Sequence, residues 1–223
     1  SDEEMKEWLT SNKPNWGSKW QAGDVKYKDL TGEGEVTPGA STLENHGDLK
    51  RIGNNSPRYR VGLNLDAAWK GIDFSIFFQG VLKRDWMFDA GDPYFWGAGS
   101  GMWQAACFEE HMDYWTPENT DAYYPKPYFN ETKNQQAQDA YMQKASYLRC
   151  KNIQLGYTLP THITEKAGIS NCRIYLSCDN LFTITGLSSV YDPEVFGSYD
   201  GYGTSGKTYP LQRTISVGVN LNF

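Results

Sequence analysis

The chain has 223 residues, a formal net charge of -6 and a mean hydropathy of -0.64. No apolar run approaches the roughly 18 to 20 residues that a spanning helix requires, which excludes a helical membrane protein. The charges are spread along the chain without a cluster of Lys and Arg, so the sequence predicts no nucleic-acid partner. A β-barrel membrane protein is still allowed, because its strands alternate outward apolar with inward polar residues and average out as hydrophilic.

Residues 1–58 precede the first strand-like pattern. The start, Ser1-Asp2-Glu3-Glu4-Met5, has neither the basic region nor the apolar region of a signal peptide. We therefore expect the chain to begin inside a longer gene product. The four cysteines show no CxxC pair and no His at ligand spacing, which predicts small apolar side chains and no metal site. They are Cys107, Cys150, Cys172 and Cys178.

The first strand is predicted over residues 59–70, where the pattern has a strict period of two. Ten steps from Tyr59 to Trp69 at about 3.3 Å each span roughly 33 Å, which a tilt of about 40° projects to roughly 25 Å. That height matches the apolar band of a membrane barrel, with an aromatic residue at each rim. One face would hold Tyr59, Val61, Leu63, Leu65, Ala67 and Trp69, and the other Arg60, Gly62, Asn64, Asp66, Ala68 and Lys70.

A tight turn at Lys70-Gly71 is predicted to lead into a second strand over residues 72–85. Its two faces repeat the division of the first strand. The apolar face would hold Ile72, Phe74, Ile76, Phe78 and Leu82, and the polar face Asp73, Ser75, Gln79 and Lys83.

Three further strands are predicted downstream. Residues 147–159 and 172–185 alternate less cleanly, and a parity change near Asp179-Asn180 predicts a β-bulge. Residues 212–223 alternate strictly to the last position, Phe223. A terminal aromatic residue at an outward position resembles the signal by which outer-membrane barrels are recognised for insertion.

The connections alternate in length. Long loops are predicted over residues 86–146 and 186–211, with short or medium turns after the first and third strands. Barrels have short periplasmic turns and long outer loops, so the long segments, including residues 1–58, are predicted to be extracellular. About five strands cannot close a barrel, since the smallest have about eight. The remaining strands must come from another part of the same protein.

A series of motifs resembles the C-terminal portion of a SusC-like (SusC/RagA family) TonB-dependent transporter of the Bacteroidetes group. The resemblance covers nearly all of the chain after about Gly23, in the correct order. The motifs begin at Gly23-Asp24-Val25-Lys26-Tyr27-Lys28-Asp29, Ile52-Gly53-Asn54-Asn55-Ser56-Pro57, Gly71-Ile72-Asp73-Phe74 and Tyr114-Trp115-Thr116-Pro117. They continue at Tyr147-Leu148-Arg149, Asp179-Asn180-Leu181-Phe182-Thr183, Tyr191-Asp192-Pro193-Glu194 and Tyr209-Pro210.

The resemblance implies an antiparallel transmembrane β-barrel of 22 strands in the bacterial outer membrane, of which this chain supplies the last five or so. It implies four partners: the rest of the same barrel with its plug, a SusD-like surface lipoprotein as lid, TonB through the N-terminal part, and outer-membrane lipid. No cofactor is implied. The expected function is TonB-dependent uptake of a bulky nutrient, an oligosaccharide or a peptide.

The family often has a calcium-like acidic turn after its Gly-Asp-x-x-Tyr segment. Here the corresponding positions are Asp29, Thr31, Glu33 and Gly34, and Ala40 stands where an EF-hand places its bidentate Glu. With that incomplete ligand set, the favoured interpretation is an acidic, solvent-exposed turn without a metal ion.

Candidate functional residues fall into three groups. Aromatic residues of the loop over 86–146 could stack on a substrate, although they could equally pack the loop onto itself. The substrate-binding candidates are Trp96, Trp103, Trp115 and Tyr124. The residues expected to line the lumen are Arg60, Asn64, Asp66, Asp73 and Gln79. Those expected to face lipid are Tyr59, Leu63, Trp69, Phe74, Phe78, Val217 and Phe223.

Two other classes of protein stay open at this point. A secreted carbohydrate-binding β-sandwich would also explain aromatic loops and a low hydropathy. A glycoside hydrolase would need paired carboxylates, for which Glu109, Glu110, Asp192 and Glu194 are candidates. No nucleophile elbow, zinc motif or phosphate loop accompanies them, so the sequence predicts no enzyme.

Overall fold

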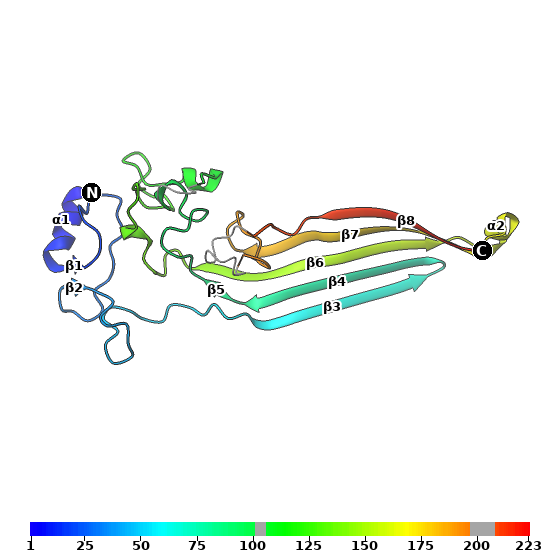
Figure 1. The fold of residues 1–223 in the computed structure, drawn as a ribbon, viewed down its shortest axis with the longest axis horizontal. Helices are drawn as coiled ribbons and strands as arrows, with labels where there is room; N and C mark the ends of the chain where they lie inside the picture. Colours follow the sequence, from blue (N-terminus) through cyan, green and yellow to red (C-terminus); the bar gives the residue numbers. More distant parts are fainter. Residues whose placement is uncertain (101–105, 197–207) are drawn as a thin grey trace. The chain divides into compact units, whose positions relative to one another are not determined.

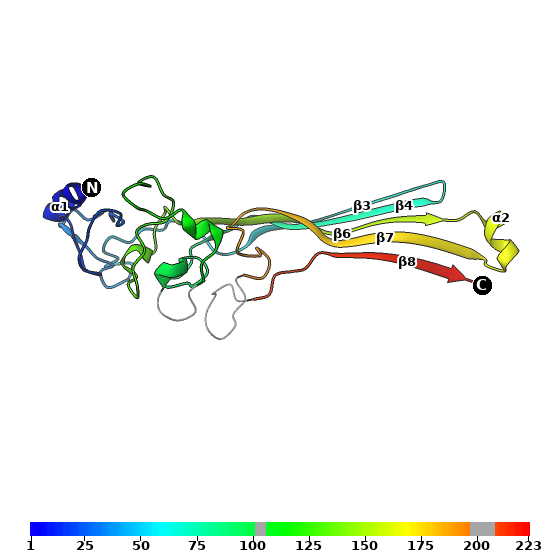
Figure 2. The ribbon, with the colours of Figure 1, turned by 90° about the horizontal axis from the view of Figure 1, so that it is seen from above.

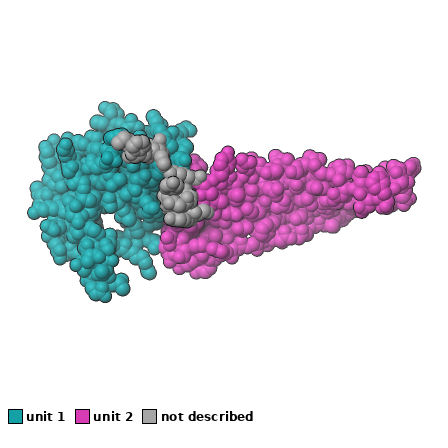
Figure 3. Space-filling view, in the orientation of Figure 1, with its two compact units in different colours: residues 1–53, 87–142, 199–207 teal, residues 54–86, 143–198, 208–223 magenta. Residues whose placement is uncertain are grey.

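The computed structural model describes residues 1–100, 106–196 and 208–223. It divides the chain into two compact units (Figure 3). The first, which we call the loop unit, contains Ser1–Gly53 and Met87–Met142. The second, the sheet unit, contains Asn54–Trp86 and the described residues of 143–198 and 208–223. Each unit is described by itself.

The sheet unit is one antiparallel sheet in the order β3-β4-β6-β7-β8 (Figures 1 and 2). The predicted all-β, antiparallel fold is confirmed. A short strand, β5 (Asp85–Trp86), pairs with the start of β6. The long strands are β3 (Arg58–Trp69), β4 (Ile72–Lys83), β6 (Gln143–Thr158), β7 (Asn171–Gly186) and β8 (Thr214–Asn222).

Two turns close one end of this sheet. Lys70 and Gly71 have φ of 47° and 84° and form the whole connection between β3 and β4. Positive φ at both central residues is the type I′ geometry that matches the twist of paired strands. The β6–β7 connection instead holds the short helix α2 (Thr161–Thr164) and the 3-10 turn η4 (Glu165–Ala167), ended by Gly168 at φ 71°.

The sheet is irregular near the predicted bulge. Cys150 pairs with Phe182, whereas Asn152 pairs with Asp179, so β7 carries one more residue here than β6. Asn180 has a φ of 51°, so a β-bulge is present as predicted. At the same level, β6 carries one more residue than β4. The alternation of apolar and polar faces therefore changes on β6, at Lys151. It does not change on β7, which has two residues more than β4 here.

The loop unit contains a helix that the sequence patterns did not predict. Helix α1 (Asp2–Ser11) starts with a capping box between Ser1 and Glu4 and buries Met5. Strands β1 (Lys13–Pro14) and β2 (Glu35–Val36) pair in parallel, and three 3-10 turns follow: η1 (Gly97–Ser100), η2 (Glu109–Met112) and η3 (Lys133–Gln135). In the described part of the chain, no helix has the length and apolar character to span a membrane.

A buried ion pair joins two distant segments of the loop unit. Lys133 Nζ lies 2.9 Å from Asp24 Oδ2, and both side chains are fully buried. Asn134 donates to Asp24 and accepts from the Val25 amide, both at 3.0 Å. The Tyr27 hydroxyl donates to the Lys133 carbonyl at 2.8 Å. The motif that starts at Gly23 therefore holds the N-terminal segment against η3.

Candidate functional site

The register of the five long strands separates apolar from polar side chains. Directly paired residues of antiparallel strands share a face, and neighbouring rows lie on opposite faces. One row across the sheet reads Ala67, Phe74, Leu155, Leu176 and Val217. The adjacent row reads Asp66, Ser75, Gln154, Ser177 and Ser216.

The apolar face is open to its surroundings. Leu63 is 53% exposed and Val217 75% exposed. Apart from the end row that contains Asp85, Lys144 and Gly186, the paired rows of this face in the described residues include no Asp, Glu, Lys or Arg. An exposed apolar face opposite a polar one is the arrangement that the wall of an outer-membrane β-barrel requires.

Five of the seven residues expected to face lipid lie on this apolar face by register: Leu63, Trp69, Phe74, Phe78 and Val217. Tyr59 is exposed but has a φ of 55°, so its backbone departs from strand geometry. Phe223 is exposed and lies one residue beyond β8.

The opposite face carries all five residues expected to line the lumen: Arg60, Asn64, Asp66, Asp73 and Gln79. Asp73 forms an ion pair with Arg173, which reaches over β6 from β7 and also donates to Gln154 at 3.0 Å. The reach is possible because Gly156 lies between them, where a Cβ atom would overlap both charged groups. Asn64 donates a hydrogen bond to Asp66.

A second ion cluster on the polar face was missed by the sequence analysis. Arg149 is 3% exposed and donates to Asp192 at 2.7 Å and to Glu194 at 2.9 Å. Lys151 Nζ lies 3.1 Å from the same Glu194 carboxylate. The Asp192 carboxylate also accepts from the Leu211 amide at 2.9 Å, which ties the segment after β7 to the approach to β8. The two motifs that contain these residues are recognisable in the sequence, but nothing in them indicates that they pair.

This cluster bears on the hydrolase alternative. Asp192 and Glu194 both serve as ion-pair acceptors for buried or half-buried cations. Carboxylates that are already engaged in ion pairs of this kind are suited to fixing a chain segment.

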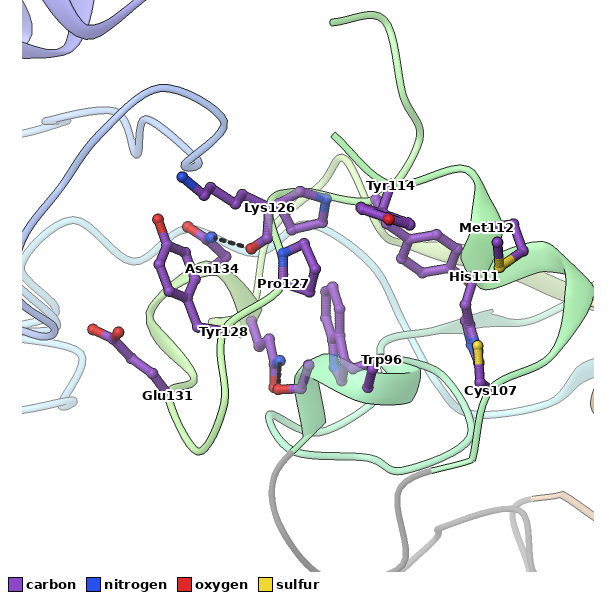
Figure 4. A pocket seen from close by; sticks show the side chains of 15 residues that line it. Trp96, Cys107, His111, Met112, Tyr114, Lys126, Pro127, Tyr128, Glu131 and Asn134 are labelled. Atoms are coloured by element: carbon purple, nitrogen blue, oxygen red, sulfur yellow. Dashed lines mark hydrogen bonds between the residues drawn. The ribbon is translucent and has the colours of Figure 1, made fainter. Parts of the chain in front are cut away.

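The loop unit holds a pocket of about 320 Å³ (Figure 4). Two predicted substrate-binding residues, Trp96 and Tyr124, line it and are almost fully buried. Burial raises the pKa of the Tyr124 hydroxyl. Trp115 lines a different pocket, and Trp103 lies outside the described residues.

His111 is a pocket residue that the sequence analysis did not select. It is 7% exposed, and its Nδ1 accepts from the Phe108 amide at 3.0 Å. A neutral imidazole with Nδ1 as acceptor carries its proton on Nε2. That Nε2 is buried and has no hydrogen-bond partner among residues 1–100, 106–196 and 208–223.

The acidic turn is organised by its own backbone. Asp29 accepts from the amides of Gly32 at 2.6 Å and Gly34 at 2.8 Å, and these hydrogen bonds, that from Gly34 first, lower the pKa of its carboxyl. Asp48 accepts from the amides of Leu30 and Thr37. Across residues 1–100, 106–196 and 208–223, no group of three or more His, Cys, Asp or Glu could hold a metal ion.

The comparisons with known proteins agree with a barrel wall. TonB-dependent receptor P3 of Formosa agariphila is 29% identical over 208 residues, which cover 90% of this chain and 19% of the relative. TonB-dependent receptor P26 of the same organism is 26% identical over 209 residues, covering 90% of this chain and 20% of the relative. The chain therefore spans about a fifth of the length of these relatives. No family model matches.

A solved structure shows the same fold. The RagAB peptide importer in its closed-closed state matches with a TM-score of 0.52 at 23% identity, over 78% of this chain and 18% of that chain. The resemblance to a portion of a SusC/RagA-like TonB-dependent transporter is confirmed. The sheet unit has the fold of part of the wall of a β-barrel.

Proposed function

We propose that this chain supplies barrel wall and extracellular loops to a TonB-dependent importer of a bulky nutrient, an oligosaccharide or a peptide. The observation that carries the proposal is that one face of a single sheet is apolar across all five long strands while the opposite face holds the charged and polar residues, with Phe77 and Val81 as exceptions. The names of the relatives, which are TonB-dependent receptors, support the coarse function.

The apolar face is assigned to lipid and the polar face to a wet lumen. The 12 residues of β3 span about 40 Å at 3.3 Å each, enough to cross an apolar band of about 25 Å at a barrel's usual tilt. In water the same face would expose a large apolar area, which costs about 25 cal/mol of free energy per Å². Contact with hydrocarbon removes that cost. Under this assignment Arg60, Asn64, Asp66, Asp73 and Gln79 line the lumen.

The β-sandwich alternative needs a second sheet packed on the apolar face. The described part of the sheet unit contains one sheet only. Its outer strands, β3 and β8, have no further partner strand among the described residues. Unpaired edges are not tolerated in hydrocarbon, so the rest of the barrel is expected to pair with both.

The remaining partners follow from the transport cycle. A SusD-like lipoprotein would hold substrate against the outer loops, and TonB would act through the plug in another part of the protein. The wall described here would stay in place while the plug rearranges. Its role is passive, and no catalytic step is assigned to it.

Accessibility of paired positions tests the lipid and lumen assignment. In the intact transporter, with Cys107, Cys150, Cys172 and Cys178 replaced by Ala, a nitroxide would be attached at Leu63→Cys or at Asn64→Cys. Collisions with oxygen, which concentrates in lipid, should dominate at position 63, and those with a water-soluble nickel complex at position 64. The pair Val217→Cys and Ser216→Cys should repeat the contrast. Equal accessibility to the nickel complex at both members of each pair would refute the membrane wall.

Uptake tests the function itself. Cells lacking the transporter gene should lose growth on one class of oligomer, oligosaccharide or peptide, and keep growth on its monomers. Restoring the gene should restore growth only while TonB is present. Normal growth of the deletion strain on every oligomer would contradict the proposal.

A further inference from the structure

We propose that residues 187–196 form a fixed inner layer on the polar face of the sheet unit, and that this layer limits the width of what passes through the lumen. We call residues 187–196 the inner segment, and we assign to Arg149 the role of holding it in place. The inference rests on the proposed function, because the polar face is a lumen wall only under that assignment. It adds to the import function a size limit and the residue that maintains it.

The first step is the position of Arg149 on the wall. Arg149 pairs with Gln79 of β4 and with Thr183 of β7, and Gln79 lies on the same face of β4 as Asp73. The Arg149 side chain is therefore on the polar face, where its Nε donates to Thr183 Oγ1 at 2.7 Å. Any group that the other guanidinium nitrogens contact must lie on this face too.

The second step is that both of those nitrogens contact the inner segment. Arg149 Nη2 donates to Asp192 at 2.7 Å and Nη1 donates to Glu194 at 2.9 Å. The Asp192 carboxylate also accepts from the Glu194 amide at 2.9 Å, which fixes the local turn. Figure 1 shows the inner segment, in orange, following β7 and lying beside β6. Arg149 thus joins the wall to the inner segment through buried, charge-assisted hydrogen bonds, which are stronger than neutral ones.

The third step concerns apolar side chains on the polar face. Val81 and Tyr147 pair with each other on this face, and each is only 7% exposed. Phe196 of the inner segment packs edge-on against Trp86, with ring centroids 4.9 Å apart, and the Arg84 guanidinium lies over both rings. Apolar groups on a bare wet wall would face water at a cost in free energy. A covering inner layer accounts for their burial.

The consequence is a narrower passage at this level. Thr183 precedes Gly186, the last residue of β7, by three residues, so the inner segment turns back along the wall by about 10 Å. A layer of chain packed on a sheet adds roughly 10 Å of thickness. A bulky oligomer that passes this level meets the inner segment and not the strands, and the space left beside the inner segment sets the greatest width that can pass.

The test measures passage width in the intact transporter, with its four native cysteines replaced by Ala. Ser177→Cys places a thiol on the polar face of β7, six residues nearer the start of the strand than Thr183. Intact cells are treated with a small sulfonated maleimide or with a maleimide that carries a long polyethylene glycol chain. The measured quantity is the rate with the long reagent divided by the rate with the small one, because this ratio cancels changes in the reactivity of the thiol itself.

Arg149→Met should raise this ratio at least tenfold. The change leaves the buried carboxylates of Asp192 and Glu194 without the guanidinium, and removal of one partner from a buried ion pair is strongly destabilising. The double change Asp192→Asn with Glu194→Gln keeps the shape of both side chains but removes their charges, so it should raise the ratio less. Arg173→Met is the matched control, because it breaks an ion pair with Asp73 that lies on the same face but includes no residue of the inner segment, and it should leave the ratio unchanged.

A second thiol tests the cover directly. Val81→Cys should react slowly with the small maleimide in the otherwise unmodified transporter, and at least tenfold faster when combined with Arg149→Met. The amount of each variant in the outer membrane and its trypsin sensitivity show whether it is folded. Should Arg149→Met fail that check, the double change at Asp192 and Glu194 decides, with both thiols as readouts.

Two results would overturn the inference: a ratio at Ser177→Cys that does not rise when the deciding variant is folded, or an equal rise in Arg173→Met. Equal labelling of Val81→Cys with and without the deciding change would also overturn it. Failure of the proposed function has a different signature. A thiol at Ser177→Cys that reacts with neither reagent in any variant would contradict the wet lumen itself, and the size limit would fall with it.

Discussion

The two units of this chain are built on opposite principles. In the sheet unit, backbone hydrogen bonds between neighbouring strands form a regular pattern, and apolar side chains are exposed on one face. The loop unit has little regular structure, and it buries aromatic side chains together with a lysine-carboxylate pair. Under the proposed function, the sheet depends on surrounding hydrocarbon, whereas the loop unit depends on internal polar contacts. Mutations should therefore destabilise the loop unit by breaking buried polar contacts, and the sheet unit by placing charge on its apolar face.

The largest effect is expected for the buried lysine of the loop unit. Lys133→Met leaves Asp24 without its cation and frees the carbonyls of Ser18 and Lys19, which the ammonium also contacts at 3.2 Å. Breaking a buried pair by removing one partner costs about 3–5 kcal/mol. Cleavage of residues 18–28 by trypsin in the intact transporter should accelerate strongly.

The control for this prediction is Lys126→Met. Lys126 lies in the same unit but is only half-buried, with the rings of Trp115 and Tyr128 as its contacts. It should change cleavage little. Equal rates in the two variants, after allowing for the lost trypsin sites, would show that burial of the ion pair does not stabilise the loop unit.

The next largest effect is expected for an arginine placed on the apolar face of the sheet unit. Leu176 lies on the apolar face, in the row with Leu155 and Val217, and Ser177 lies next to it on the polar face. Leu176→Arg should destabilise the barrel by about 2–4 kcal/mol, as expected for arginine near the middle of a lipid-facing strand. Ser177→Arg should cost far less. The measurement is the urea midpoint of the intact transporter in lipid, and matching midpoints would remove the lipid assignment.

A smaller effect is expected at Gly156, which lies against the Arg173–Asp73 ion pair on the polar face. Gly156→Ala would place a methyl group against the Arg173–Asp73 ion pair, so the two side chains must move apart. Because both are partly exposed and flexible, the cost should be about 1 kcal/mol. Gly62→Ala is the matched control, since its nearest neighbour, the Phe77 ring, would lie 3.5 Å away. A difference in unfolding midpoint between the two variants checks the prediction, and none would contradict it.

The sequence predicts the sheet unit better than the loop unit, because the features of the sheet are local in the chain. Alternation with a period of two is local, so the amino-acid pattern alone assigns residues such as Leu63 and Asn64 to opposite faces. The Arg149–Asp192 contact and the Lys133–Asp24 contact join positions far apart in the chain, and no local pattern encodes them. Ion pairs of this kind can be predicted only once it is known which segments lie side by side.

The candidate site follows the same rule. The aromatic residues Trp96 and Tyr124 could be named from composition alone, whereas the buried position of His111 and its hydrogen bond with the Phe108 amide follow only from the folded loop. The bulge was visible near Asp179, but the change of faces at Lys151 arises from pairing with β4 and β7 together. Sequence reasoning identified element types and faces well and side-chain partnerships poorly.

The smallest effect concerns the acidic turn of the loop unit and is a pH dependence. Amide hydrogen bonds, that from Gly34 first and Gly32 next, lower the pKa of the Asp29 carboxyl below its value in an unfolded chain. A carboxyl whose pKa is lowered by folding contributes stability above its unfolded pKa of about 4 and loses it as pH falls through the folded pKa. Pepsin should therefore cut residues 29–37 faster as pH falls below about 4, relative to a reference peptide.

Asp29→Asn should be cut faster than the unmodified protein at every pH, because one oxygen acceptor is lost, and its rate should not change further over that range. Glu33→Gln, an exposed carboxylate in the same turn, should keep the pH profile of the unmodified protein. A flat profile for the unmodified protein would mean that the hydrogen bonds of Asp29 do not hold this turn. The order of the loop unit would then rest on Lys133 and Asp24 and not on its acidic turn.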